Sequence, residues 1–131
     1  MNLKLELVPV PVTDIDRAIR FYNEQVGFVL DVDHVPADGV RFVQFTPVGS
    51  ACSIVLSHGV PALDRMAPGS VHGLHLVVDD IEAARTELRD RGVDVAEIID
   101  VGGGVRFAEF ADPDGNTLLL QEMAWRTGEN F

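Results

Sequence analysis

The sequence predicts an α+β fold made of two βαβββ modules, with cupped mixed sheets and the helices outside. The first observation is an internal repeat, because Val40–Phe45 matches Val105–Phe110 position by position 65 residues later. The second is a pair of helix starts, since Val12–Ile15 and Val78–Ile81 share the pattern Val-x-Asp-Ile at a separation of 66 residues. A repeat that covers strands and helix starts indicates two copies of one supersecondary unit within a single domain.

The strongest local signal is the stretch Asp112–Asn116, which reads Asp-Pro-Asp-Gly-Asn. Proline presets φ and glycine accepts the left-handed conformation, so this stretch predicts a tight turn. The apolar run Leu118–Leu120 follows at once and predicts a buried strand. Pro47–Gly49 is the counterpart of Pro113–Gly115 in the first half, so each module is expected to contain a hairpin.

The first module is expected over residues 3–57. Alternation predicts a strand at Leu3–Val10, and Thr13–Asp16 supplies cap chemistry for a helix that runs to Gln25. The three further strands of this module are predicted at Phe28–Val35, Val40–Thr46 and Ala51–Ser57. Residues 58–71 are rich in glycine and proline and have weak periodicity, so they are predicted to connect the two modules.

The second module is expected over residues 72–122. A strand is predicted at Leu74–Val78, and Asp79 with Glu82 forms a capping-box pattern before a helix that ends at Arg91. The remaining strands are predicted at Val93–Ile99, Val105–Ala111 and Thr117–Glu122, and Gly102–Gly104 as a turn or cavity lip. The tail, residues 123–131, is expected either to fray or to be anchored on the sheet by Trp125.

Composition excludes several classes of partner. The 21 acidic and 10 basic residues leave a net charge of −11, which repels nucleic acid and anionic membranes and favours neutral or cationic ligands. No apolar run approaches the roughly 20 residues that cross a bilayer. The single cysteine, Cys52, has no partner for an intramolecular disulfide, and the N-terminus lacks the pattern of a signal peptide. A cytoplasmic protein is therefore expected.

The two modules, their Val-x-Asp-Ile helix starts and the closing Asp-Pro-Asp-Gly-Asn-Thr stretch together resemble the vicinal oxygen chelate (VOC) superfamily. This superfamily includes glyoxalases, bleomycin resistance proteins, fosfomycin-modifying enzymes and extradiol dioxygenases. The resemblance extends from about Leu3 to Glu122. It implies the fold strongly, but one such fold carries many chemistries, so function depends on the site.

The resemblance also implies where a metal would bind, because metal-dependent members take His or Glu ligands from the middle of four strands. The matching positions here are Leu7, Ser53, Gly73 and Leu119. None of them is a usual ligand for a divalent metal. The expectation is therefore no metal at these positions and no cofactor. If a divalent metal binds elsewhere on the concave face, His75 is the first residue that we expect to contact it.

Two polar residues lie two positions beyond the absent ligands. His75 and Gln121 share strand parity with Gly73 and Leu119, so they should point to the same concave face. His75 is either a polar anchor or proton-transfer group in an apolar cup, or an ordinary hydrogen-bonded strand histidine. Gln121 is either a ligand-orienting amide or a satisfied interior residue.

Two further pairs occupy matching positions in the modules, Arg41 with Arg106 and Gln44 with Glu109. The side chains of such pairs either line a cavity shared by the two modules or lie at solvent-facing positions of the strands. The aromatic residues, including Phe107 and Trp125 as candidate ligand contacts, either line an apolar cleft or belong to the core. The other histidines, His34, His58 and His72, are expected in solvent.

Two functional classes remain open. The first is a metal-free protein similar to the bleomycin resistance branch, which would bind a small organic molecule such as a drug or antibiotic. The second is an enzyme, a lyase, isomerase or dioxygenase-like member, that uses displaced ligands or acid–base chemistry through the candidate catalytic residues His75 and Glu109. In either case the resemblance implies a homodimer.

Overall fold

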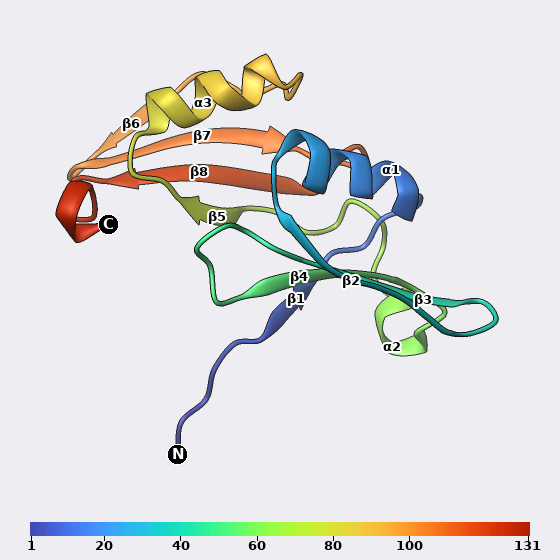
Figure 1. Ribbon diagram of the computed structural model, residues 1–131. Coiled ribbons are helices and arrows are strands. Elements are labelled where there is room, and N and C mark those ends of the chain that lie inside the picture. Colours follow the sequence, from blue (N-terminus) through green and yellow to red (C-terminus); the bar gives the residue numbers. More distant parts are fainter.

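The two predicted modules form two four-stranded sheets in the computed structural model, which describes residues 1–131 (Figure 1). In both sheets the first strand of the module runs parallel to the last, and the other neighbours are antiparallel. Sheet A has the order β1-β4-β3-β2 and sheet B the order β5-β8-β7-β6. The strands are β1 (Leu7–Pro9), β2 (Val29–Ala37), β3 (Val40–Thr46), β4 (Ser53–His58), β5 (Leu74–Val77), β6 (Ile99–Gly102), β7 (Val105–Ala111) and β8 (Thr117–Met123). The α+β fold of two βαβββ modules is confirmed.

Each module carries one main helix. Helix α1 (Ile15–Ile19) continues into a π-helical segment, η1 (Arg20–Gln25), and α3 spans Ile81–Asp90. Figure 1 shows α1 and α3 on the upper sides of sheets A and B, whereas the short helix α2 (Pro61–Asp64) of the connector lies below sheet A. A 3-10 turn, Gly128–Asn130, ends the chain. No helix has the length and apolar character that crossing a membrane requires.

Aspartates cap both main helices. Asp14 accepts a hydrogen bond from the Arg17 N–H, and Asp80 accepts one from the Ala83 N–H, both at 3.0 Å. The expected capping box of Asp79 with Glu82 is wrong, because Asp80 occupies the cap position. Asp79 instead accepts the backbone N–H of Gly128 at 2.6 Å and so holds the C-terminal tail.

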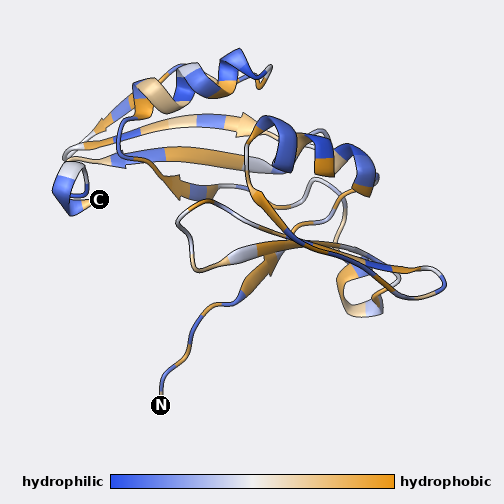
Figure 2. Cartoon of the chain, viewed as in Figure 1, coloured by the Kyte–Doolittle hydropathy of each residue, from blue (hydrophilic) through white to orange (hydrophobic).

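The core lies between the helices and the sheets and includes residues of both modules. In β3 the buried side chains are Val43 and Phe45, and in β7 they are Ala108 and Phe110. The hydropathy colouring shows apolar stretches along the central strands (Figure 2). Because strand side chains alternate, these buried residues identify the helix-covered face of each sheet. One continuous cluster of 19 buried residues contains side chains of both modules.

The predicted hairpin at Asp112–Asn116 is confirmed and joins the modules. The Asp112 carboxylate accepts hydrogen bonds from the backbone N–H groups of Asp114 and Asn116 at 2.9 and 3.0 Å. Its second oxygen accepts from the Tyr22 hydroxyl and the Asn116 side-chain amide, both at 2.8 Å. Asn116 also donates to the carbonyl of Pro11 at 2.8 Å. The turn therefore connects β8 with η1 and with the segment after β1.

Two predicted strand starts are wrong by four residues or more, for identifiable reasons, whereas the other differing boundaries shift by three residues or fewer. The first strand begins at Leu7 and not at Leu3, because its partner β4 begins at Ser53 and offers earlier residues no ladder. Strand β6 begins at Ile99 and not at Val93. The Arg85 guanidinium donates to the carbonyls of residues 95 and 96, which occupies acceptors that a strand ladder would use.

Candidate functional site

Each sheet has a face without a main helix, which we call open face A and open face B. Strand parity and register assign their residues. Open face A contains Leu7, Pro9, Val32, Phe42, Gln44, Thr46, Ser53, Val55 and Ser57. Open face B contains His75, Val77, Ile99, Val105, Phe107, Glu109, Leu119, Gln121 and Met123. Because α1 and α3 lie on the same side, both open faces turn to the opposite side of the molecule (Figure 1).

His75 and Phe107 lie together on open face B. Their ring centroids are 5.5 Å apart at an interplanar angle of 87°, an edge-to-face contact. Gln121 is the cross-strand neighbour of Phe107 in β8. The Nδ1 atom of His75 lies 2.6 Å from the carbonyl oxygen of Gly73. Since a carbonyl only accepts, Nδ1 donates, and the neutral ring keeps its lone pair on Nε2 for a ligand.

Glu109 shares open face B with His75, but the two side chains lie two strands apart. Both are cross-strand neighbours of Leu119 in the central strand β8. Strands are spaced by roughly 4.8 Å, so the two backbones are about 10 Å apart. Direct proton transfer between the two groups is therefore excluded, whereas a ligand over Leu119 would reach both.

Arg41 and Arg106 lie on the helix-covered faces, opposite to Gln44 and Glu109. Arg41 pairs with Asp16 and Asp33 at 2.9 and 2.8 Å. The expectation that these arginines line a shared cavity with Gln44 and Glu109 does not match this geometry. Residues 41 and 44 are three positions apart in β3, and residues 106 and 109 are three positions apart in β7. Because strand side chains alternate between the two faces, each arginine points to the opposite face of its sheet from Gln44 or Glu109.

The matching pair around Arg106 joins α3 to sheet B. Arg106 contacts Glu122 at 2.8 Å and Glu82 at 3.1 Å. Hydrogen bonds from the Ile81 N–H and from Arg106 hold the pKa of Glu122 below its usual value. The carboxylates beside Arg106, Glu122 first, raise the pKa of the guanidinium. Both arginines therefore tie a helix to its sheet.

Open face A carries a chain of polar groups that the sequence interpretation missed. The Thr46 hydroxyl donates to the Asp31 carboxylate, so the Ser53 hydroxyl must donate to Thr46, 2.6 Å away. Asp31 reaches this position because the ladder of β2 is irregular between Leu30 and Val32. Ser53 itself was flagged only as a missing metal ligand, and no local signal revealed the bulge.

His75 and Ser53 line one hollow where the two sheets meet. This hollow has a volume of about 180 Å³ and mainly apolar walls, including Phe28 and Leu118. His75 also lines a neighbouring hollow of about 280 Å³ with the turn Pro47–Ser50 and the C-terminal Phe131. Ser53 of the first module and His75 of the second module thus lie close together beside β5, the edge strand of sheet B.

The donor set at the expected metal positions does not fit a divalent metal. Leu7 and Ser53 are register partners in sheet A, and Leu119 is the partner of His75 in sheet B. Leucine and glycine side chains have no lone pairs, and one serine hydroxyl is a weak ligand. No three His, Cys, Asp or Glu side chains of the chain are grouped so as to hold a metal ion.

The remaining candidate residues lie outside this convergence. Trp125 is 60% exposed, so it does not anchor the tail on the sheet. The tail is held instead by the contact of Asp79 with Gly128 and by a backbone hydrogen bond from Ala124 to Gly104. All four histidines are exposed, His75 as well as His34, His58 and His72, and for the last three this is as expected.

Paired βαβββ modules whose open faces combine apolar strands with isolated polar groups define a protein of the vicinal oxygen chelate class. The model of the Glyoxalase/Bleomycin resistance protein/Dioxygenase superfamily matches residues 4–120. The chain belongs to this superfamily.

Solved structures of similar chains share the whole fold. TnmS3, an antibiotic binding protein from Streptomyces sp. CB03234, is 37% identical with a TM-score of 0.81, covering 94% of this chain and 98% of that chain. A glyoxalase/bleomycin resistance protein from the same organism is 40% identical with a TM-score of 0.75, covering 89% and 98%. A glyoxylase-like domain-containing protein of Didymella fabae is 28% identical, covering 84% of this chain and 86% of that protein.

Proposed function

We propose that this protein binds a small organic molecule of the drug or antibiotic type, without a metal at the positions used by metal-dependent relatives. The observation that carries the proposal is His75, whose Nε2 is free on an apolar face beside Phe107. Ligand sites are typically apolar with a few placed polar groups, which describes this region. The similarity to TnmS3, an antibiotic binding protein, supports the same class of function.

A homodimer would complete the site. The open faces leave apolar side chains in water, with Val32 45% and Ile99 60% exposed. The two hollows lined by His75 are smaller than most drug pockets, which are roughly 300–1,000 Å³ and bury most of the ligand. A second copy placed over these faces would enclose a larger ligand. The free thiol of Cys52 suits the cytoplasm, where we expect the protein to work.

An enzyme is the second candidate, and one observation favours it. A ligand over Leu119 would lie between His75 and Glu109, a general base and a carboxyl group in reach of one substrate. Metal analysis of protein purified without chelators separates the candidates. Stoichiometric Fe, Ni, Zn or Mn would favour an enzyme with a displaced metal site over the binding protein.

The test of the binding proposal is a thermal-shift screen of planar, cationic and aromatic molecules, followed by titration calorimetry of each hit. His75→Leu keeps apolar volume and removes both ring nitrogens. It should weaken binding by about 1–3 kcal/mol, because the bound ligand would shield its polar contact with His75 from water. His72→Leu, at an exposed position just before β5, is the matched control and should bind like the parent. Equal affinity of all three proteins would remove His75 from the site.

A further inference from the structure

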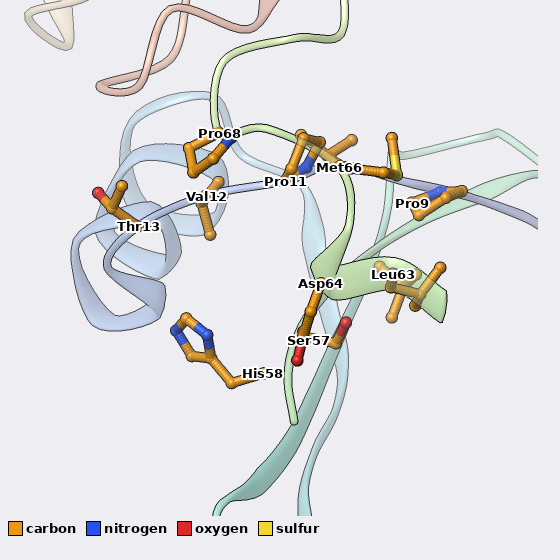
Figure 3. A pocket seen from close by; sticks show the side chains of 12 residues that line it. Pro9, Pro11, Val12, Thr13, Ser57, His58, Leu63, Asp64, Met66 and Pro68 are labelled. Atoms are coloured by element: carbon orange, nitrogen blue, oxygen red, sulfur yellow. The ribbon is translucent and has the colours of Figure 1, made fainter. Parts of the chain in front are cut away.

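A second cavity lies at the opposite end of sheet A from the hollows that His75 lines. It has a volume of about 290 Å³ and lies between the ends of β1 and β4 and the connector helix α2 (Figure 3). Its lining includes the open-face residues Pro9, Val55 and Ser57 and the connector residues Leu63 and Met66. No residue of this cavity lines either of the His75 hollows.

Three polar side chains border this cavity without partners in the chain. Ser57, His58 and Asp64 line it, and no side-chain hydrogen bond or ion pair within the chain engages any of them. Figure 3 shows these three along one side of the pocket, with Pro11, Val12 and Pro68 along the other. Asp64 and His58 are exposed and hydrated in the free protein, and a ligand with charged N–H groups could replace water at the Asp64 carboxylate.

The apolar wall is rigid and suits a flat ring. Proline has a fixed φ, and the carbonyl of Pro11 accepts hydrogen bonds from the Asn116 amide at 2.8 Å and the Gly69 N–H at 3.2 Å. The half-buried thioether of Met66 completes the wall, and sulfur makes favourable contacts with aromatic rings. The volume, at the lower end for ligand pockets, fits one ring and a short chain.

We propose that this pocket is a binding site for a one-ring arylalkylamine, with the ammonium group on Asp64 and the ring between Met66 and the prolines. The hydroxyl of Ser57 offers the ammonium a second acceptor. Carboxylates and phosphates are disfavoured, because Asp64 forms no ion pair within the chain and the chain carries a net charge of −11. The site is built by one chain alone and does not depend on the proposed function of open face B.

NMR of the methionine methyl groups tests this proposal, because the three methionines lie in three different regions of the protein and their chemical shifts respond to binding nearby. Met66 lines the pocket, Met123 lies on open face B, and Met1 is exposed at the N-terminus. Titration of the full chain with 2-phenylethylamine should shift the Met66 methyl in a saturable way. The neutral analogue 2-phenylethanol should bind about tenfold more weakly, since it lacks the charge-assisted hydrogen bond.

Variants separate this site from the other one. Asp64→Asn should weaken 2-phenylethylamine about tenfold and leave 2-phenylethanol unchanged. Asp94→Asn, at an exposed position away from the pocket, is the matched control. His75→Leu should leave the Met66 response intact, so a failure at open face B does not affect this result. An unmoved Met66 methyl at millimolar amine, equal binding of amine and alcohol, or full affinity in Asp64→Asn would each overturn the proposal.

Discussion

Removal of the Tyr22 hydroxyl should loosen the junction between the two modules. Tyr22 is fully buried, and its hydroxyl donates to the equally buried Asp112 at 2.8 Å. Tyr22→Phe keeps the ring, which packs against Phe28 and Phe45 at centroid distances of 5.7 and 6.0 Å. The loss is then one hydrogen bond to a buried carboxylate, about 1.5–3 kcal/mol of unfolding free energy. For a chain of this length that corresponds to roughly 6–12 °C in Tm.

Urea unfolding followed by far-UV circular dichroism measures this loss as a lower midpoint with an unchanged slope. A double-mutant cycle with Asp112→Asn isolates the pair, because the Phe substitution should cost much less once the carboxylate is gone. An unfolding free energy of Tyr22→Phe within about 0.5 kcal/mol of the parent value would refute this reasoning. A buried carboxylate oxygen that loses its hydrogen-bond donor should destabilise the folded state by more than that.

Two further predictions follow from the same structure. Burial, followed by the nearby Asp112 carboxylate, raises the pKa of Tyr22 above its usual value, so its contribution to stability is fully present below about pH 10 and is lost as the pH rises further. The parent should therefore lose stability above pH 10 more steeply than Tyr22→Phe in thermal unfolding scans across this range. Ile99→Asp places a charge on open face B at an exposed position, so it should convert the proposed homodimer to a monomer. Sedimentation velocity checks this, and a parent protein that is already monomeric at micromolar concentration would contradict the dimer.

Local sequence signals determined the elements of this protein. The limits of β3 at Val40–Thr46 and of β7 at Val105–Ala111 are those that the sequence predicts. Proline and glycine turns bound both strands, and these residues restrict or extend φ wherever they occur. The sequence repeat correctly identified β3 and β7 as equivalent strands of the two modules. Repeated sequence folds into repeated structure, so matching residues occupy matching strand positions. Strand parity likewise put His75 and Gln121 on one face of sheet B.

Tertiary packing alone decided which face of each sheet carries the site. The pattern of β3 has aromatic residues at both parities, Phe42 and Phe45, so alternation does not say which one meets the helix. The packing of Tyr22 on Phe45 makes that choice and sends Arg41 to the helix side. Asp31 reaches open face A only through an irregular ladder, which depends on the partner strand.

The sequence by itself therefore determined the two modules, the turn at Asp112–Asn116 and the cap of the first helix. These are properties of short windows, in which φ preferences and side-chain alternation act between near neighbours. The convergence of Ser53 with His75, the pocket under α2 and the start of β6 were decided only by the tertiary structure. Each depends on groups far apart in the chain, such as Arg85 taking the carbonyls before β6, and long-range packing selects among strand faces and registers that are locally equivalent.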